Sequence, residues 1–159
     1  MLLFCAHNMG EAGMDLDDSN RVEILETATV VLLNMGFPAR QKGYRYLREA
    51  VLLVAQEPVY MALLTKMLYP KIAKLYDTTD KQVERAIRST IEAAWKYGNH
   101  KELNEVFGDL REHKSDRPTN KQVIGRLKVR MENEMLENEW LKESFRKIQE
   151  SRRIRERSY

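Results

Sequence analysis

The polar residues best suited to chemistry lie within one stretch of nine, where they alternate with apolar residues at helical spacing. They are Lys81, Gln82, Glu84, Arg85, Arg88 and Ser89. An arginine can donate two hydrogen bonds to guanine O6 and N7, a glutamine can pair with adenine, and a glutamate can accept from cytosine N4. On one helix face these side chains could read base edges in DNA. A charged helix face is also commonly just a solvated surface, so this stretch alone leaves both interpretations open.

Lysines near this stretch could neutralise the phosphates of a bound duplex. The candidates are Lys66, Lys71, Lys74 and Lys81, with Lys96 at the far end of the same predicted helix. The whole chain has 27 Lys and Arg against 24 Asp and Glu, a net charge of +3. This charge is compatible with a polyanionic partner, but it is too small to demonstrate one.

A short helix, a tight turn and a longer helix should position these side chains. The spacing predicts the short helix at about 71–76 and the turn at 77–79. Thr79 and Gln82 have the form of a capping box, which predicts that the longer helix begins there and runs to about Tyr97. In a helix-turn-helix the first turns of the second helix enter the major groove. Gln82 is therefore both a candidate helix cap and a candidate base contact.

Helical spacing extends over most of the remaining chain. It predicts further helices at 21–35, 40–56, 58–69, 100–107 and from 119 to about 155, with Gly36, Gly98 and Gly108 as helix ends. Strand patterns are nearly absent, which predicts an all-α fold. We divide the chain into a flexible leader (1–20), a helix-turn-helix domain (21–131) and a charged helical C-terminal extension (132–159).

Several function classes find no support in the sequence. The single Cys5 excludes an internal disulfide and favours a reducing compartment. Apolar runs are too short to span a membrane. The three histidines, His7, His100 and His113, lie far apart and lack ligand spacing. With no glycine-rich phosphate loop or nucleophile–base arrangement, we expect no enzyme activity, cofactor or metal, and a cytoplasmic protein at the bacterial nucleoid.

Aromatic residues are more simply explained by packing than by stacking on a ligand. Trp95 and Tyr97 are predicted to pack into the core, and Tyr44, Tyr46 and Tyr69 to lie in the core or an interface.

Short blocks between about residues 30 and 130 follow one another in an order that resembles a known domain. The blocks are Gly36–Ala39, Lys42–Ala50, Thr65–Pro70, Ile72–Lys74, Val83–Arg88, Ala94–Trp95, Gly98–Asn99 and Arg117–Asn120. They resemble the C-terminal effector domain of the master sporulation-initiation response regulator of spore-forming Firmicutes, the stage 0 sporulation protein A family. The resemblance implies a six-helix effector fold that binds a short asymmetric DNA box, often as tandem dimers, and activates or represses transcription.

The resemblance also implies roles for individual residues. Glu84 and Arg85 match positions that face the major groove, and Arg88 matches a position for which a phosphate contact is expected. Gln82 and Ser89 depart, since the best-known members have Arg and His there. Losing an arginine removes a bidentate guanine contact, so discrimination at that base pair should fall by about 1–3 kcal/mol. The base-contacting candidates are thus Gln82, Glu84, Arg85 and Ser89.

Full-length family members carry an N-terminal receiver domain, and residues 1–20 are too few to form one. Control by phosphorylation within this chain is therefore not expected. Double-stranded DNA is the predicted partner. RNA polymerase and a second copy of the chain, on tandem sites or through the C-terminal helix, are further candidates.

The C-terminal extension allows three interpretations. An approximate apolar stripe continues along it with Trp140 beside it, and its end is basic; the stripe consists of Ile124, Leu127, Met131, Met135, Leu141, Phe145 and Ile148. The segment is a solvated helix that frays, a helix for self-association or a partner, or a source of extra phosphate contacts. Accordingly the first functional hypothesis is a sequence-specific transcription regulator. The alternative is a receiver-less interaction module, an adaptor or antagonist of a full-length regulator, and a non-specific nucleoid binder is a weaker third.

Overall fold

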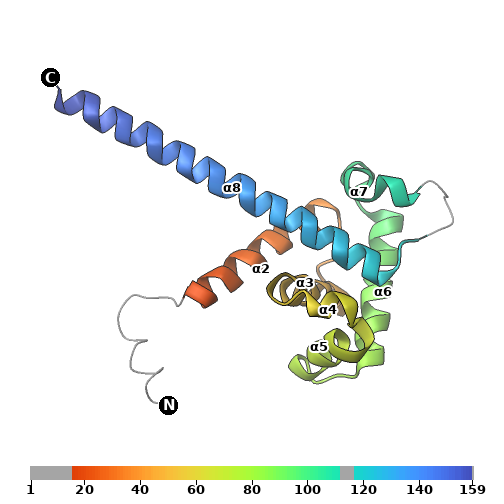
Figure 1. Cartoon of the computed structure of the whole chain (residues 1–159). Coiled ribbons are helices and arrows are strands. Elements are labelled where there is room, and N and C mark those ends of the chain that lie inside the picture. Colours follow the sequence, from red (N-terminus) through yellow and green to blue (C-terminus); the bar gives the residue numbers. More distant parts are fainter. Residues whose placement is uncertain (1–15, 112–116, 159) are drawn as a thin grey trace, which may run out of the picture.

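The computed structural model describes residues 16–111 and 117–158, and within these ranges the chain forms helices and no strands. Cys5, His7 and His113 lie outside the described residues. Figure 1 shows a group of packed helices from which the second half of the last helix projects. In chain order the elements are α2 (Leu16–Asn34), α3 (Lys42–Gln56), α4 (Val59–Ala62), the π-helical turn η2 (Leu64–Leu68), α5 (Tyr69–Leu75), α6 (Asp80–Tyr97), α7 (His100–Phe107), the 3-10 turn η3 (Gly108–Arg111) and α8 (Asn120–Arg157). The predicted all-α fold is confirmed.

The end of α2 is fixed by Gly36, as the sequence predicts. Gly36 has φ +80°, a left-handed conformation that glycine adopts without steric cost. The Phe37 N–H donates to the Leu32 carbonyl at 3.0 Å, which completes the usual glycine-terminated helix end. A Cβ on Gly36 would lie only 2.7 Å from the Cα of Gly98, at the end of α6. The turn after α2 and the end of α6 are therefore in direct contact.

The helix α3 holds α6 at close range through a second glycine. A Cβ on Gly43 would lie 2.0 Å from the Ala86 carbonyl oxygen, so only glycine lets the two backbones approach this closely. Beside this contact the fully buried Thr90 hydroxyl donates to the Gln41 side chain at 2.9 Å. The position of α6 is thus set by its backbone contact with α3 as well as by apolar packing.

Apolar side chains from every long helix form one core. Fully buried examples are Leu32, Leu47, Leu52, Ile72, Ile87, Leu103, Phe107 and Ile124. Trp95 is partly buried, with its ring 5.3 Å from the ring of Phe107 in an edge-to-face arrangement. Tyr44, Tyr46 and Tyr69 are buried, in agreement with the prediction. The prediction for Tyr97 is wrong: it is 76% exposed, because it occupies the last, solvent-facing position of α6.

Two predicted boundaries are also wrong. The leader expected over 1–20 ends earlier, since α2 already begins at Leu16. Its first turn then contains Asp18, whose carboxylate is stabilised near the positive end of the helix dipole. The acidic and polar end of the predicted leader is therefore the beginning of a helix.

The helix predicted over 58–69 is interrupted at Leu63, which has φ −127° and ψ 52°. From there η2 leads directly into α5, and the Leu68 N–H donates to the Leu63 carbonyl at 3.2 Å. Pro70 has no N–H, so regular hydrogen bonding cannot continue through it, and a wider turn precedes it. Pro70 itself lies in the first turn of α5, where the missing N–H is tolerated.

The last helix begins where the sequence predicts and changes environment along its length. Both hydrogen bonds of a capping box join Thr119 and Gln122. Val123, Ile124, Leu127 and Met131 are buried, and α8 packs mainly against α2 and α3, whereas none of the described residues after Met131 is buried. Among the described helices none is both long and apolar enough to cross a membrane.

Candidate nucleic-acid interface

The turn between α5 and α6 is stabilised by its own backbone. Asp77 has φ 51°, a left-handed conformation that aspartate tolerates better than most residues. The Thr78 N–H donates to the Ala73 carbonyl at 2.9 Å, which closes the end of α5. Ile72 and Ala73 on α5 and Val83 on α6 are buried, so the two helices share apolar contacts on either side of the turn. This is the predicted helix-turn-helix, with the second helix beginning at Asp80.

The start of α6 carries only half of the predicted capping box. The Gln82 N–H donates to the Thr79 hydroxyl at 3.3 Å. The Gln82 side chain does not return to the Thr79 backbone, because its Oε1 accepts from the Thr78 hydroxyl instead. Gln82 is thus tied to the turn through its amide oxygen, while its amide nitrogen has no partner among the described residues. The bond from Thr78 and a DNA contact would therefore compete for the same oxygen of Gln82.

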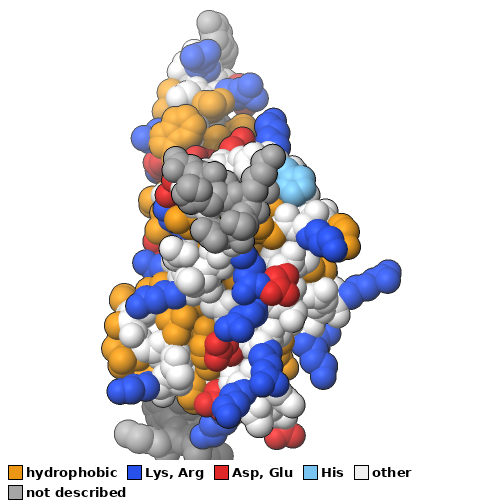
Figure 2. Space-filling view, turned by 90° about the vertical axis from the view of Figure 1, so that its right-hand side faces the viewer, with side chains coloured by type: hydrophobic (Ala, Val, Ile, Leu, Met, Phe, Trp, Pro, Cys, Tyr) orange, Lys and Arg blue, Asp and Glu red, His pale blue; other side chains and the backbone are white. Residues whose placement is uncertain are grey.

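The two sides of α6 differ sharply in burial. Val83, Ile87 and Ile91 are completely buried, which anchors one side in the core. The opposite side presents the predicted polar set: Lys81, Gln82, Arg85, Arg88 and Ser89 are exposed, and Glu84 is half-buried. Figure 2, viewed from the α6 side of the molecule, shows Lys and Arg side chains gathered over the middle and lower part of this face, with fewer acidic ones between them.

The arginines on this face are not equivalent. Arg88 Nη2 lies 3.0 Å from Glu84 Oε1 in an ion pair one helical turn apart, as the spacing predicts. Such a pair in water contributes only about 0.3–0.5 kcal/mol, so either partner can be recruited by a ligand at small cost. Arg85 has no ion-pair partner in the described parts of the chain. Its guanidinium is free to donate.

The predicted phosphate-binding lysines lie on three successive elements. Lys66 is on η2, Lys71 and Lys74 are on α5, and Lys81 is on the first turn of α6; all four side chains are exposed and unpaired within the described ranges. Lys96 is fifteen residues beyond Lys81, or about 22 Å along the helix axis. Its ammonium lies 5.1 Å from the centroid of the Tyr97 ring. The structure therefore separates Lys96 from the basic residues around the turn.

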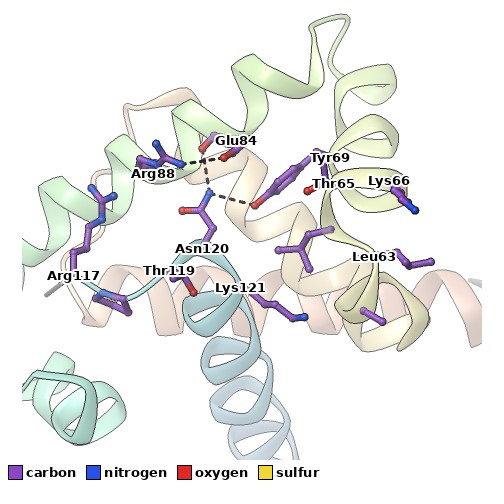
Figure 3. A pocket seen from close by; sticks show the side chains of 13 residues that line it. Leu63, Thr65, Lys66, Tyr69, Glu84, Arg88, Arg117, Thr119, Asn120 and Lys121 are labelled. Atoms are coloured by element: carbon purple, nitrogen blue, oxygen red, sulfur yellow. Dashed lines mark hydrogen bonds and ion pairs between the residues drawn. The ribbon is translucent and has the colours of Figure 1, made fainter.

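A cavity of about 530 Å³ adjoins the exposed face of α6, between η2, α5 and the start of α8 (Figure 3). Its lining includes four cationic side chains from three parts of the chain, namely Lys66, Arg88, Arg117 and Lys121. Asn120 crosses its floor, donating to the Tyr69 hydroxyl at 3.3 Å and to the Glu84 carbonyl at 3.2 Å. Burial raises the pKa of Tyr69, so this hydroxyl stays protonated at neutral pH. The cavity wall is thus a polar junction between α8 and the helix-turn-helix.

The sequence did not predict a role in the interface for Arg117 or Lys121, although Arg117 begins one of the matched blocks. Some thirty residues separate them from Arg88, and only the return of the chain into α8 brings them beside it. Arg117 forms an ion pair with Glu92 on α6. Arg117 lies two residues before Thr119, and Lys121 lies between Thr119 and Gln122. Nothing in this local pattern indicated a contact with α6.

No group of three or more His, Cys, Asp or Glu side chains that could hold a metal ion occurs within residues 16–111 and 117–158.

Residues 28–131 match the family described as the C-terminal domain of the sporulation initiation factor Spo0A. The match covers well over half of the 159 residues, contains the whole helix-turn-helix, and ends at Met131, the last buried residue of α8. Residues beyond Met131 lie outside it. The chain belongs to the Spo0A C-terminal family of DNA-binding effector domains.

Proposed function

We propose that this chain is a sequence-specific transcription regulator that reads the major groove with the first three turns of α6. Base contacts come from Gln82, Glu84, Arg85 and Ser89, and phosphate contacts from Lys66, Lys71, Lys74, Lys81 and Arg88. One observation carries the proposal: α6 has one fully buried side and one exposed side that bears these polar residues next to the turn. A contact with RNA polymerase, expected of an activator, stays a prediction.

Among the base-reading candidates Arg85 has the leading role. Its side chain is exposed and unpaired in the described residues, so both guanidinium donors can meet guanine O6 and N7 without breaking an existing bond. Arg88 is held by Glu84 at 3.0 Å, which suits a phosphate contact made beside the groove. The ion pair uses Glu84 Oε1, so cytosine N4 would donate to the other carboxylate oxygen, Oε2.

Binding to duplexes carrying the family's DNA box, compared with scrambled duplexes at one stated salt concentration, tests the proposal. Replacing Arg85 by Gln should cost about 1–3 kcal/mol on the specific duplex and little on the scrambled one. Lys74→Ala should weaken binding to both duplexes alike and reduce the slope of log affinity against log salt by about 0.9. Lys101→Gln, on the exposed surface of α7, is the matched control. Equal affinity of the wild-type chain for both duplexes would refute specific recognition.

A second candidate function is an interaction module that acts on another protein. It is favoured by the exposed large apolar side chains of α8, such as Trp140 and Phe145, and by the departures at Gln82 and Ser89. This function predicts retained co-purification with a helical partner by a chain in which Arg85→Gln has weakened specific DNA binding. Loss of that partner when the chain is truncated after Met135 would support binding through the C-terminal extension. A partner that the truncated chain retains would show that the extension is not its binding site.

A further inference from the structure

The second half of α8 exposes more apolar surface than any other described segment. After Met135, which is partly buried, six large apolar side chains are between 45% and 69% exposed: Leu136, Trp140, Leu141, Phe145, Ile148 and Ile154. Leu141, Phe145 and Ile148 are spaced by four and three residues, so they lie along one side of the helix. In Figure 1 this part of α8 projects away from the other helices. Such a patch usually marks a surface that another molecule covers.

The charges of the same segment are divided along its length. Residues 132–143 contain five glutamates and one lysine, a net charge of −4, whereas residues 144–157 contain six Lys or Arg and two glutamates, a net charge of +4. The helix dipole explains only part of this division, because its effect falls off within the last turn, where Arg155 and Arg157 lie. The acidic half is in mid-helix, where the dipole offers it no stabilisation.

Ion pairs within α8 neutralise only part of this charge. Glu132, Glu134, Glu139 and Glu143 are paired with basic residues three or four positions away on the same helix. Glu137, Glu150, Glu156 and the four arginines from Arg152 onward have no ion-pair partner in the parts of the chain that the structure describes. The unpaired charge is therefore negative at Glu137 and net positive beyond Ile148.

We propose that the C-terminal extension, residues 132–157, associates with the same segment of a second copy in antiparallel orientation. This orientation puts the acidic half of each copy beside the basic half of the other. A parallel pair would put like charges side by side, which is unfavourable. The division of charge thus favours a second copy of the extension as the partner of the apolar face, and it favours the antiparallel orientation of the two helices.

The positions along the helix agree with this arrangement. If two antiparallel copies cross near Phe145, Glu137 of each copy lies within about one turn of Arg152, Arg153 and Arg155 of the other. Glu137 and Arg155 are eighteen residues, or five full turns, apart, and therefore lie on the same side of α8 as each other. Leu141, four residues before the crossing, meets Ile148, three residues after it.

The side of the extension that carries Leu141, Phe145 and Ile148 is the part that two copies can bury together. These residues give two exposed aromatic and four exposed aliphatic side chains in a pair, and the stems of Glu137, Arg152 and Arg155 lie on the same side. Leu136 and Ile154 are each nine residues, or two and a half turns, from Phe145 and lie on the opposite side. The inference does not depend on the proposed DNA binding. It does imply that the two effector domains of a pair lie at opposite ends of the joined helices.

Sedimentation equilibrium of the full chain, without DNA, gives the first test. We expect a mass that rises with concentration to twice the 18.7 kDa of one chain. Leu141→Ser combined with Phe145→Ser should keep the chain monomeric without loss of helix by circular dichroism, since neither side chain is buried. A wild-type chain that remains monomeric at about 0.1 mM would overturn the proposal.

Charge reversal then tests the orientation. Glu137→Lys in one chain and Arg152→Glu with Arg155→Glu in another should each weaken self-association at least tenfold. Mixing the two variants should restore a dimer, and Lys101→Glu, on the exposed surface of α7, should change nothing. Failure of the mixed variants to associate would contradict the charge pairing.

Disulfide trapping distinguishes the two directions independently, in a chain whose single cysteine is removed by Cys5→Ser. Mixed chains carrying Glu137→Cys or Arg155→Cys should form the 137–155 crosslink. Preferential 137–137 and 155–155 crosslinks would show a parallel pair and overturn the antiparallel assignment.

Discussion

The helix α6 and the second half of α8 both carry large apolar residues at helical spacing, but these residues end in opposite environments. Ile87 and Ile91 on α6 are 0% exposed, whereas Phe145 and Ile148 on α8 are 63% and 51% exposed. The outward side of α6 is polar, without a large apolar residue between Lys81 and Ser89. This surface suits a charged, hydrated ligand such as DNA, and the extension suits another apolar helix. The same helical spacing of apolar residues therefore corresponds to a buried face in α6 and to a solvent-exposed face in α8.

The largest expected effect comes from matched truncations of isoleucine in the two helices. Ile87→Ala should lower the free energy of unfolding by about 2–5 kcal/mol, because it opens a cavity in the core. Ile148→Ala should change it by less than about 0.5 kcal/mol, since the side chain is already half in water. Urea unfolding at low protein concentration, where the chain is monomeric, measures both. Similar losses for the two variants would mean that the extension is packed against the domain.

Alanine substitutions at two glycines, one beside α6 and one on α8, should give the next largest difference in stability. Gly43→Ala should cost about 1–3 kcal/mol or more, because its Cβ would collide with the Ala86 carbonyl oxygen of α6 and push the two helices apart. Gly125→Ala on α8 meets only the flexible end of Met61, at 3.2 Å, and should gain up to about 1 kcal/mol in helix propensity.

Thermal or urea unfolding compares the two glycine variants directly, and DNA affinity gives a second readout for Gly43→Ala. Because α3 sets the position of α6, DNA binding should fall even under conditions where the variant is fully folded. Unchanged stability of Gly43→Ala would show that α3 and α6 can separate freely.

The smallest effect distinguishes the two helix caps. Thr119→Ala should cost about 1 kcal/mol, because it removes one bond of a complete capping box. Thr79→Ala should cost less, since the Gln82 side chain is held by Thr78 and remains attached to the turn. Unfolding free energies of the two variants measure the difference. A larger loss for Thr79→Ala would indicate that the turn before α6 depends on this cap alone.

Local chemistry explains which parts of the fold the sequence could predict. The end of α2 at Gly36, the start of the last helix at Thr119 and the apolar spacing of α6 depend on chemistry within one or two turns, and each of these predictions is confirmed. The break at Leu63 and the exposure of Tyr97 depend on how neighbouring elements meet, so periodicity could not give them.

The candidate interface divides in the same way. The exposed set from Lys81 to Ser89 follows from helical spacing. Arg117 and Lys121 reach the cavity only because the chain returns beside α6 at the start of α8. The Gln82 side chain accepts from Thr78 because of the side-chain geometry in the turn. Helical spacing gives neither feature. Base contacts themselves require the DNA and remain predictions.

Selection of bound duplexes from a random DNA library tests the central claim most directly, with the full chain, the chain ended after Met135 and the Arg85→Gln variant compared in parallel. We predict that the full and shortened chains enrich the same short asymmetric motif, and that Arg85→Gln loses the preference for guanine at one position. Enrichment of no motif by the full chain, or of the same motif by Arg85→Gln with its guanine preference unchanged, would contradict base reading by α6.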